Sequence, residues 1–234
     1  MSCILHIETS TRVCSVALSQ DGLLMFHKEE MDGPNHAVSC PVFVQEAMDF
    51  VKEKALTLDA VAVSEGPGSY TGLRIGVSTA KGVSYGSEIP LLGIPTLQTL
   101  CVPVLLYHEE VPEDALLVPM IDARRMEVYA AVYDRALREV RPAQADIVGT
   151  QTYDAYLQRG PVCFFGDGAS KCKAVITHPN AVFIDDIVPL ARHMFPLAET
   201  AMARGEVKDT AYFEPFYLKD FIATKSRDML ANLA

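Results

Sequence analysis

The segment best suited to chemistry is a glycine-rich stretch, 64–76, which reads Ser-Glu-Gly-Pro-Gly-Ser-Tyr-Thr-Gly-Leu-Arg-Ile-Gly. Glycines just before a helix let the backbone approach an anion, and the first N–H groups of the helix can bind it. The stretch is not a P-loop, because Gly-Lys-Ser/Thr is absent, and its glycine spacing is one residue too long for G-x-G-x-x-G. Two interpretations stay open: an anion-binding loop, or a tight turn in which Ser69 or Thr71 caps the helix.

Two acidic residues, Glu8 and Asp122, each end an apolar run that we expect to be a strand. In two-lobed ATPases of the actin type, such hairpins contact phosphates and magnesium-bound water. Turn acids also cap their own backbone, and no lysine stands in the first turn to meet a phosphate. Candidate nucleotide- or anion-binding residues are therefore Glu8, Thr9, Ser10, Gly66, Gly68, Ser69, Thr71, Gly72 and Asp122.

Metal chemistry and covalent catalysis find no support in the spacing of residues. The six histidines are never four apart, and the six cysteines form no C-x-x-C pair. No G-x-S-x-G elbow is present. We therefore predict no metal site and no catalytic residue, and we interpret the cysteines as reduced packing residues.

The elements that must position these residues alternate between strands and helices. Apolar, β-branched runs separated by polar turns predict a three-stranded meander at the start of the chain. Helical spacing predicts long helices on either side of the next strand, and one further apolar segment, 96–107, is ambiguous. The expected strands are 3–7, 13–18, 23–28, 58–63 and 90–94, and the expected helices are 37–54 and 71–85.

The opening hairpin recurs 114 residues later, which suggests duplicated halves. Ile7-Glu8 matches Ile121-Asp122, and residues 16–18 match residues 130–132. The second half is then expected to contain strands at 116–121, 128–133, 162–165 and 181–184, and helices at 152–158 and 189–204 with Gly205 as the C-terminal cap. The aromatic segment 214–219 resembles a docking strand more than a helix.

The two long helices are apolar on more than one face. In 37–54, one stripe contains Cys40, Val44 and Ala47, while Val38 and Val42 lie on the other side. One core cannot bury both faces, so either a deep interior position or a helical subunit interface is expected.

Composition limits the function further. The chain has 234 residues, with 20 Lys plus Arg against 30 Asp plus Glu, for a formal net charge of −10. Autonomous nucleic-acid binding requires clustered positive charge and is not expected. The N-terminus lacks a basic leader, and the most apolar run, 102–107, is far shorter than the ~20 residues of a membrane helix. We expect a soluble cytoplasmic protein that does not contact a membrane.

Together these motifs resemble the bacterial TsaB (YeaZ) family. The likeness rests on residues 4–18, 64–76, 93–97, 121–124 and 214–219, and it is weakest over 140–186. It implies an α/β fold of the two-lobed actin/Hsp70-like ATPase (ASKHA) class with duplicated mixed-sheet halves. We expect lobes at 1–108 and 109–234, with the helix at about 189–204 packing back on the first lobe.

The resemblance also implies a role. Such proteins are non-catalytic partners in making N6-threonylcarbamoyladenosine at position 37 of tRNA: they pair with and activate a TsaD-like catalytic subunit, and a TsaE-like ATPase joins them. The H-x-x-x-H pair expected of the catalytic subunit is missing here. On this interpretation tRNA binds only through the complex, no cofactor is required, and ATP or ADP would bind weakly. The alternative is a weak ATPase or nucleotide-binding protein of the actin/Hsp70 class that acts alone.

In the family, the dimer face is built from the two helices that follow the third strand and the glycine-rich loop. The resemblance and the helical wheel together predict a partner interface, and the C-terminal aromatic segment is expected to extend it. Alone, the same face is expected to form a homodimer. The predicted interface residues are Val38, Val42, Gln45, Ile75, Ser78, Gly82, Tyr85, Tyr217, Leu218 and Lys219.

Overall fold

A computed structural model describes residues 2–31, 33 and 35–219. Residues 1, 32, 34 and 220–234 lie outside this description, including the end of the predicted second lobe. The elements of the first half are β1 (Cys3–Glu8), β2 (Cys14–Gln20), β3 (Leu23–Glu30), α1 (His36–Glu53), β4 (Ala60–Gly66), α2 (Tyr70–Ser87), β5 (Leu91–Pro95) and α3 (Thr96–Tyr107). The second half contains β6 (Leu116–Asp122), β7 (Glu127–Tyr133), β8 (Glu139–Ile147), α4 (Asp154–Leu157), β9 (Val162–Phe165), the 3₁₀ helix η1 (Ser170–Cys172), β10 (Ala181–Ile184), the 3₁₀ helix η2 (Ala191–His193) and α5 (Phe195–Ala203).

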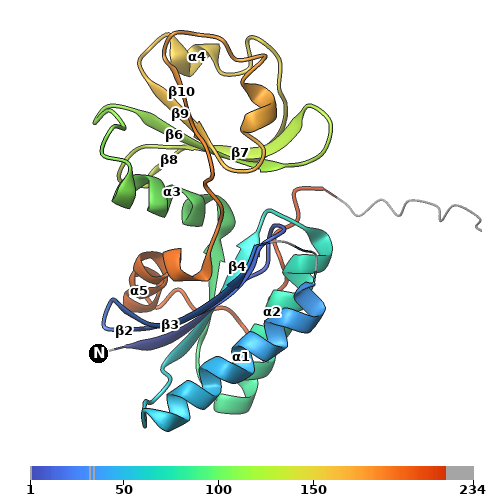
Figure 1. The fold of residues 1–234 in the computed structure, drawn as a ribbon, viewed down its shortest axis with the longest axis vertical. Helices are drawn as coiled ribbons and strands as arrows, with labels where there is room; N and C mark the ends of the chain where they lie inside the picture. The colour runs from blue at the N-terminus through green and yellow to red at the C-terminus, as the bar shows by residue number, and fades with distance from the viewer. Residues whose placement is uncertain (1, 32, 34, 220–234) are drawn as a thin grey trace, which may run out of the picture.

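Two five-stranded mixed sheets organise these elements, one in each lobe (Figure 1). The first sheet has the order β3-β2-β1-β4-β5, and the second has the matching order β8-β7-β6-β9-β10. In each sheet three antiparallel strands form a meander, and two parallel strands extend it. The predicted α/β class with duplicated mixed sheets is therefore confirmed.

The predicted repeat needs one correction, in its second strand. Glu8 pairs with Ser15, whereas Asp122 pairs with Val128, so the turn after β1 is one residue longer than the turn after β6. Counted from the strand-end acids, Val16 corresponds to Tyr129, the partner of Ile121, and not to Ala130. A one-residue offset reverses which face a side chain points to, which an ungapped alignment cannot detect.

The first sheet is buried on both faces, which explains why β1 is apolar throughout rather than alternating. Cys3, Leu5 and Ile7 point toward the core under α1 and α2. Ile4 points to the opposite face, where Ala198 and neighbouring residues of α5 cover it. The C-terminal helix thus returns to the first sheet, with α3 and α5 lying between the two sheets (Figure 1).

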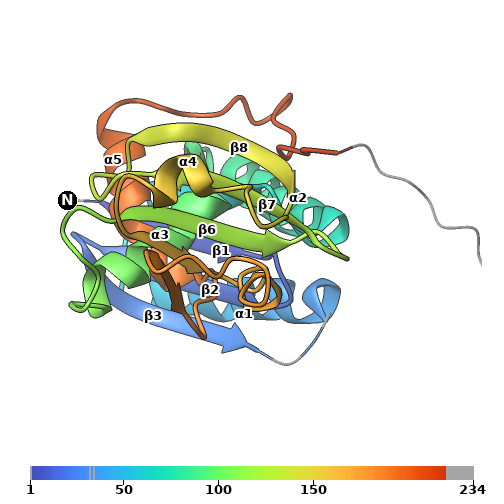
Figure 2. The same ribbon diagram turned by 90° about the horizontal axis from the view of Figure 1, so that it is seen from above.

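The second sheet has a thinner covering. One face packs against α3, and the other packs against α4 and η1. Viewed from above, this sheet lies over the first, and the C-terminal segment runs along one side of both (Figure 2).

The helix predicted at 189–204 is shorter than expected, because η2 and Met194 precede α5. Gly205 follows the end of α5 with φ +68°, as predicted for a C-terminal cap.

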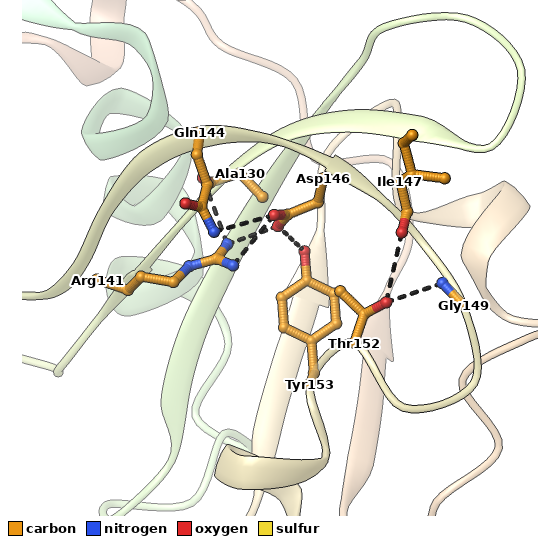
Figure 3. Close-up of polar contacts among 8 residues, drawn as sticks. All are labelled: Ala130, Arg141, Gln144, Asp146, Ile147, Gly149, Thr152 and Tyr153. Carbon is orange, nitrogen blue, oxygen red and sulfur yellow. Dashed lines mark hydrogen bonds and ion pairs between the residues drawn. The ribbon is translucent and has the colours of Figure 1, made fainter.

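Strand β8 was missed by sequence reasoning and is held by a buried polar cluster (Figure 3). Asp146 accepts hydrogen bonds from Arg141 Nη2 at 2.6 Å, from the Tyr153 hydroxyl at 2.6 Å and from Gln144 at 3.1 Å. Burial, followed by the Asp146 carboxylate, raises the pKa of Tyr153. The cluster joins β8 to the start of α4, where the first lobe has an 18-residue helix instead.

Among residues 2–31, 33 and 35–219, no helix combines the length and the apolar character needed to cross a membrane.

Candidate functional site

A cleft of about 740 Å³ opens between the two lobes. Its walls come from the β1–β2 turn and the start of α2 on one side, and from the ends of β6 and β9 on the other. Of the predicted anion-binding residues, Ser10, Gly68, Ser69, Thr71, Gly72 and Asp122 line it. Glu8, Thr9 and Gly66 do not.

Glu8 lies beneath the cleft wall, fully buried at the end of β1. Its Oε1 accepts a hydrogen bond from the Ser10 backbone N–H at 2.6 Å. Its Oε2 has no hydrogen-bond partner among the described residues. Burial raises the pKa of Glu8, which opposes the charged form that would hold magnesium-bound water.

The two loops of the first lobe press against each other. The backbone N–H of Ser69 donates to the carbonyl oxygen of Ser10 at 2.6 Å, and the Thr9 hydroxyl donates to the Gly72 carbonyl at 2.8 Å. A Cβ at Gly68 would overlap Ser10, and a Cβ at Gly72 would overlap the carbonyl oxygen of Thr9. The glycines are needed here for close backbone contact between these loops.

These contacts use the groups that would bind a phosphate. The N–H of Gly72 is also taken, by the Ser69 hydroxyl at 3.3 Å, so Ser69 is the N-terminal cap of α2, as the second interpretation predicted. The amides of Ser10, Ser69 and Gly72 are thus engaged by contacts within the first lobe.

The second-lobe wall carries more exposed polar groups. Asp122 forms an ion pair with Lys171, and its Oδ1 accepts the backbone N–H of Arg124 at 2.9 Å. Asp167 Oδ1 accepts the backbone N–H of Asp122 at 2.9 Å. Although Asp167 is exposed, partial desolvation of its carboxyl raises its pKa, and the neighbouring Asp122 carboxylate adds to the effect.

The C-terminal segment closes one side of the cleft. The Phe216 N–H donates to the Glu65 carbonyl at 2.7 Å, and the Tyr217 ring packs on Tyr70 with centroids 4.9 Å apart. Lys219 then reaches the second lobe and pairs with Glu127 at 2.5 Å. Residues 214–219 form no helix, in agreement with the sequence, and the Phe216 N–H bond to Glu65 holds them against the end of β4; docking of this segment on a partner stays a prediction.

A second candidate surface is the outer face of α1 and α2. Val38, Val42 and Tyr85 are 69%, 49% and 83% exposed, although all are large and apolar. Gln45, Ser78 and Gly82 are exposed beside them, and Ile75 is half-buried. The opposite faces, with Cys40, Val44, Ala47, Leu73 and Val77, are buried as predicted.

A groove of about 560 Å³ runs between these helices. Its lining residues come from the start of α1 and the first turns of α2: Ala37, Pro41, Tyr70, Thr71, Arg74, Ile75, Ser78 and Thr79. Tyr70 and Ile75 also line the inter-lobe cleft, so the two candidate surfaces are continuous.

Several cleft residues escaped sequence reasoning, namely Arg12, His36, Arg124, Tyr129 and Asp167. A signal existed for Asp167: Gly166-Asp167-Gly168 stands at the end of β9 as Gly66-Pro67-Gly68 stands at the end of β4, and Gly66 and Gly166 both have positive φ. No comparable signal marks His36, whose ring bonds the Thr11 carbonyl oxygen at 2.7 Å across the fold.

Within the described part of the chain, no three His, Cys, Asp or Glu side chains lie close enough to hold a metal ion. The six cysteines are free and buried.

Comparison with known proteins adds to this geometry. A family model described as "TsaD: tRNA N6-adenosine threonylcarbamoyltransferase" matches residues 30–224. The Escherichia coli protein named tRNA threonylcarbamoyladenosine biosynthesis protein TsaB is 29% identical over 228 residues, covering 95% of this chain and 96% of the relative. The Bacillus subtilis protein of the same name is 30% identical over 176 residues, covering 74% of each chain.

Solved structures agree with these sequence matches. A Pseudomonas aeruginosa protein described as similar to the peptidase YeaZ superposes with a TM-score of 0.79 and 27% identity, covering 94% of this chain and 100% of that one. YeaZ from the same organism gives a TM-score of 0.74 at 26% identity, covering 93% and 100%. The fold is the two-lobed actin/Hsp70-like class. The chain therefore belongs to the family that the matching model describes and, within it, to the TsaB proteins.

Proposed function

We propose that this chain acts in the biosynthesis of tRNA threonylcarbamoyladenosine as a non-catalytic subunit that pairs with a TsaD-like catalytic subunit and activates it. The observation that carries the proposal is the outer α1/α2 face, where Val38, Val42 and Tyr85 expose apolar side chains to solvent. Large apolar side chains exposed on one helical layer are typical of a protein interface. In isolation the same face would form a homodimer.

Two further features support a partner role over a catalytic one. The first-lobe loops use their own amides on each other, and Glu8 is buried rather than facing the cleft. We propose that the chain requires no nucleotide and binds ATP or ADP only weakly, that a TsaE-like ATPase joins the complex, and that tRNA binds only to the assembled complex. We place this activity in the cytoplasm.

The test is a charge placed on the proposed interface. Val42→Glu should abolish association with the TsaD-like subunit, measured as complex mass by light scattering, and should abolish threonylcarbamoyl transfer to tRNA. Val140→Glu is the matched control, because Val140 is 50% exposed but lies on β8 of the other lobe. Normal association of the Val42→Glu protein would show that the interface lies elsewhere.

The alternative function, a weak ATPase, needs a separate measurement. Calorimetric titration of ATP into the purified chain should show binding no tighter than the millimolar range, about 4 kcal/mol. Glu8→Gln should leave any residual hydrolysis unchanged, since this side chain does not face the cleft. Tight binding, or turnover that depends on Glu8, would favour the ATPase.

A further inference from the structure

Three arginines at the hairpin tips beside the cleft have unpaired side chains within the described part of the chain. Arg12 lies in the β1–β2 turn, and Arg124 and Arg125 lie in the β6–β7 turn. All three are exposed, and Arg12 and Arg124 line the cleft from opposite lobes. Within residues 2–31, 33 and 35–219, their guanidinium groups form no hydrogen bond, ion pair or ring contact.

Other cations near the cleft are already engaged. Lys219 pairs with Glu127, and Lys171 pairs with Asp122. Arg74 donates to the Tyr70 hydroxyl at 2.8 Å and lies over that ring. The ion pair with Lys171 also offsets the negative charge of Asp122 on the cleft wall. The three hairpin arginines are thus unpaired positive charges on a chain whose formal net charge is −10.

The backbone of the second hairpin is unusual for arginine. Arg124 and Arg125 have φ values of +70° and +52°, in the left-handed region that favours glycine and asparagine. Each such residue typically costs about 1–2 kcal/mol when it carries a Cβ. Five other residues that carry a Cβ have positive φ as well, so the conformation alone does not mark a site; Arg124 and Arg125 differ from them in standing consecutively at the edge of the cleft.

The chemistry of these groups points to phosphate. Guanidinium is planar and permanently charged, and its forked donors match phosphate oxygens. The three groups are exposed at the tips of hairpins from two lobes, rather than gathered in an enclosed pocket. This arrangement suits successive phosphates of a long polyanion better than one small anion.

We propose that Arg12, Arg124 and Arg125 contact the phosphate backbone of tRNA held by the assembled complex. The inference rests on the proposed function, because it takes tRNA as the substrate of that complex. A few arginines add to binding without making this acidic chain a nucleic-acid-binding protein by itself. The non-catalytic subunit would then help to position the substrate as well as activate the enzyme.

The experiment compares the heterodimer with the TsaD-like subunit in two charge-matched forms. The first carries Arg12→Gln, Arg124→Asn and Arg125→Asn; asparagine tolerates the left-handed conformation, so the turn should be retained. The control carries Arg138→Gln, Arg159→Gln and Arg204→Gln, which are exposed and lie away from both the cleft lining and the α1/α2 face. Complex mass, thermal stability and tRNA affinity at several salt concentrations are measured for both.

The hairpin variant should assemble normally but bind tRNA about tenfold or more weakly. The slope of log affinity against log salt concentration should become shallower by about one for each phosphate that the removed arginines neutralise. The control should match the unmodified complex. Equal tRNA affinity and equal salt dependence in the two variants would overturn the inference. Loss of ATP binding in the hairpin variant, with tRNA binding unchanged, would assign the arginines to a nucleotide and also overturn it.

Failure of the proposed function gives a different pattern. If the unmodified chain forms no complex with the TsaD-like subunit, the partner role is wrong, whatever the arginines do. The same variants are then compared as isolated chains with tRNA at low salt, by cross-linking. Reduced cross-linking of the hairpin variant alone would retain the arginine contact, and equal cross-linking would reject it.

Discussion

The two lobes share one sheet topology but differ in what covers it. In the first lobe, α1 and α2 are each 18 residues long, bury one face and expose the other. At the matching positions of the second lobe stand α4, with four residues, and η1, with three. The duplicated sheets alone thus explain the two-lobed shape, whereas the unequal helices explain why, among the described residues, only the first lobe has a long exposed helical face.

The strand-end acids show the same divergence at single residues. Glu8 is fully buried, and Ser10 is hydrogen bonded to it, whereas the Asp122 side chain is 46% exposed and forms an ion pair with Lys171. Equal topological positions therefore have different chemistry. The first acid stabilises its own turn, and the second remains accessible at the cleft.

The largest expected effect concerns the polar cluster of the second lobe. Asp146→Ala removes the acceptor for Arg141 and Tyr153, leaving a half-buried charge and a buried hydroxyl unpaired (Figure 3). The free energy of unfolding should fall by about 3–5 kcal/mol, measured by urea denaturation. The control, Asp154→Ala, removes an acid from the first turn of α4 and should cost no more than about 1 kcal/mol. A decrease below about 1 kcal/mol for Asp146→Ala would mean that the cluster does not substitute for a helix layer.

The second-largest expected effect comes from adding a methyl group at the contact between α2 and the β1–β2 turn. A Cβ at Gly72 overlaps the backbone oxygen of Thr9, which cannot move without disturbing the sheet. Gly72→Ala should destabilise the chain by about 3 kcal/mol, the upper end for overpacking, as measured by thermal unfolding. Unchanged stability would show that the two loops can separate, which would free their amides for a phosphate.

The two lobes also differ in a buried histidine of β1, which makes the free energy of unfolding depend on pH. Burial lowers the pKa of His6 to about 3, whereas Met120 occupies the matching place in β6. The unfolded chain takes up a proton below about pH 6.5 that the folded chain does not, so the free energy of unfolding falls as the pH is lowered from 6.5 toward 3. At pH 5 this contribution is about 2 kcal/mol.

His6→Met should remove that part of the acid sensitivity. Chemical denaturation at pH 7 and pH 5 measures it, and His27→Met, at an exposed position of β3, is the control. Identical pH dependence in the two variants would mean that His6 is hydrated or paired in solution.

The smallest expected effect tests the outer face directly. Nothing lies within 4 Å of a Cβ placed at Gly82, and this position is exposed on α2. Gly82→Ala should stabilise the isolated chain by about 0.5–1 kcal/mol through helix propensity, measured by thermal unfolding. If the partner packs closely on α2, the same change should weaken the complex. Unchanged affinity would place the closest approach elsewhere on the face.

The sequence by itself determined the elements whose signals are local. Unbroken apolar runs predicted the central strands, helical spacing predicted α1 and α2 with their two apolar faces, and Ser69 and Gly205 marked helix ends. The sequence marked the glycine-rich stretch 64–76 only through its glycine content. Its role in loop-to-loop contact depends on Ser10 and Thr9, which lie more than fifty residues away.

Only the tertiary structure decided the rest. Strand β8 contains Arg141 and Asp146 without clear alternation, and these side chains are stable there because Tyr153 and Gln144 complete their hydrogen bonds. Glu8 is buried because the Ser10 amide and the packed loops surround it, and the arginines of two distant turns meet at one cleft. Hydrophobic periodicity shows which side of a segment packs against the core. The burial of a polar group depends instead on hydrogen-bond partners that are distant in the sequence and close only in the folded chain.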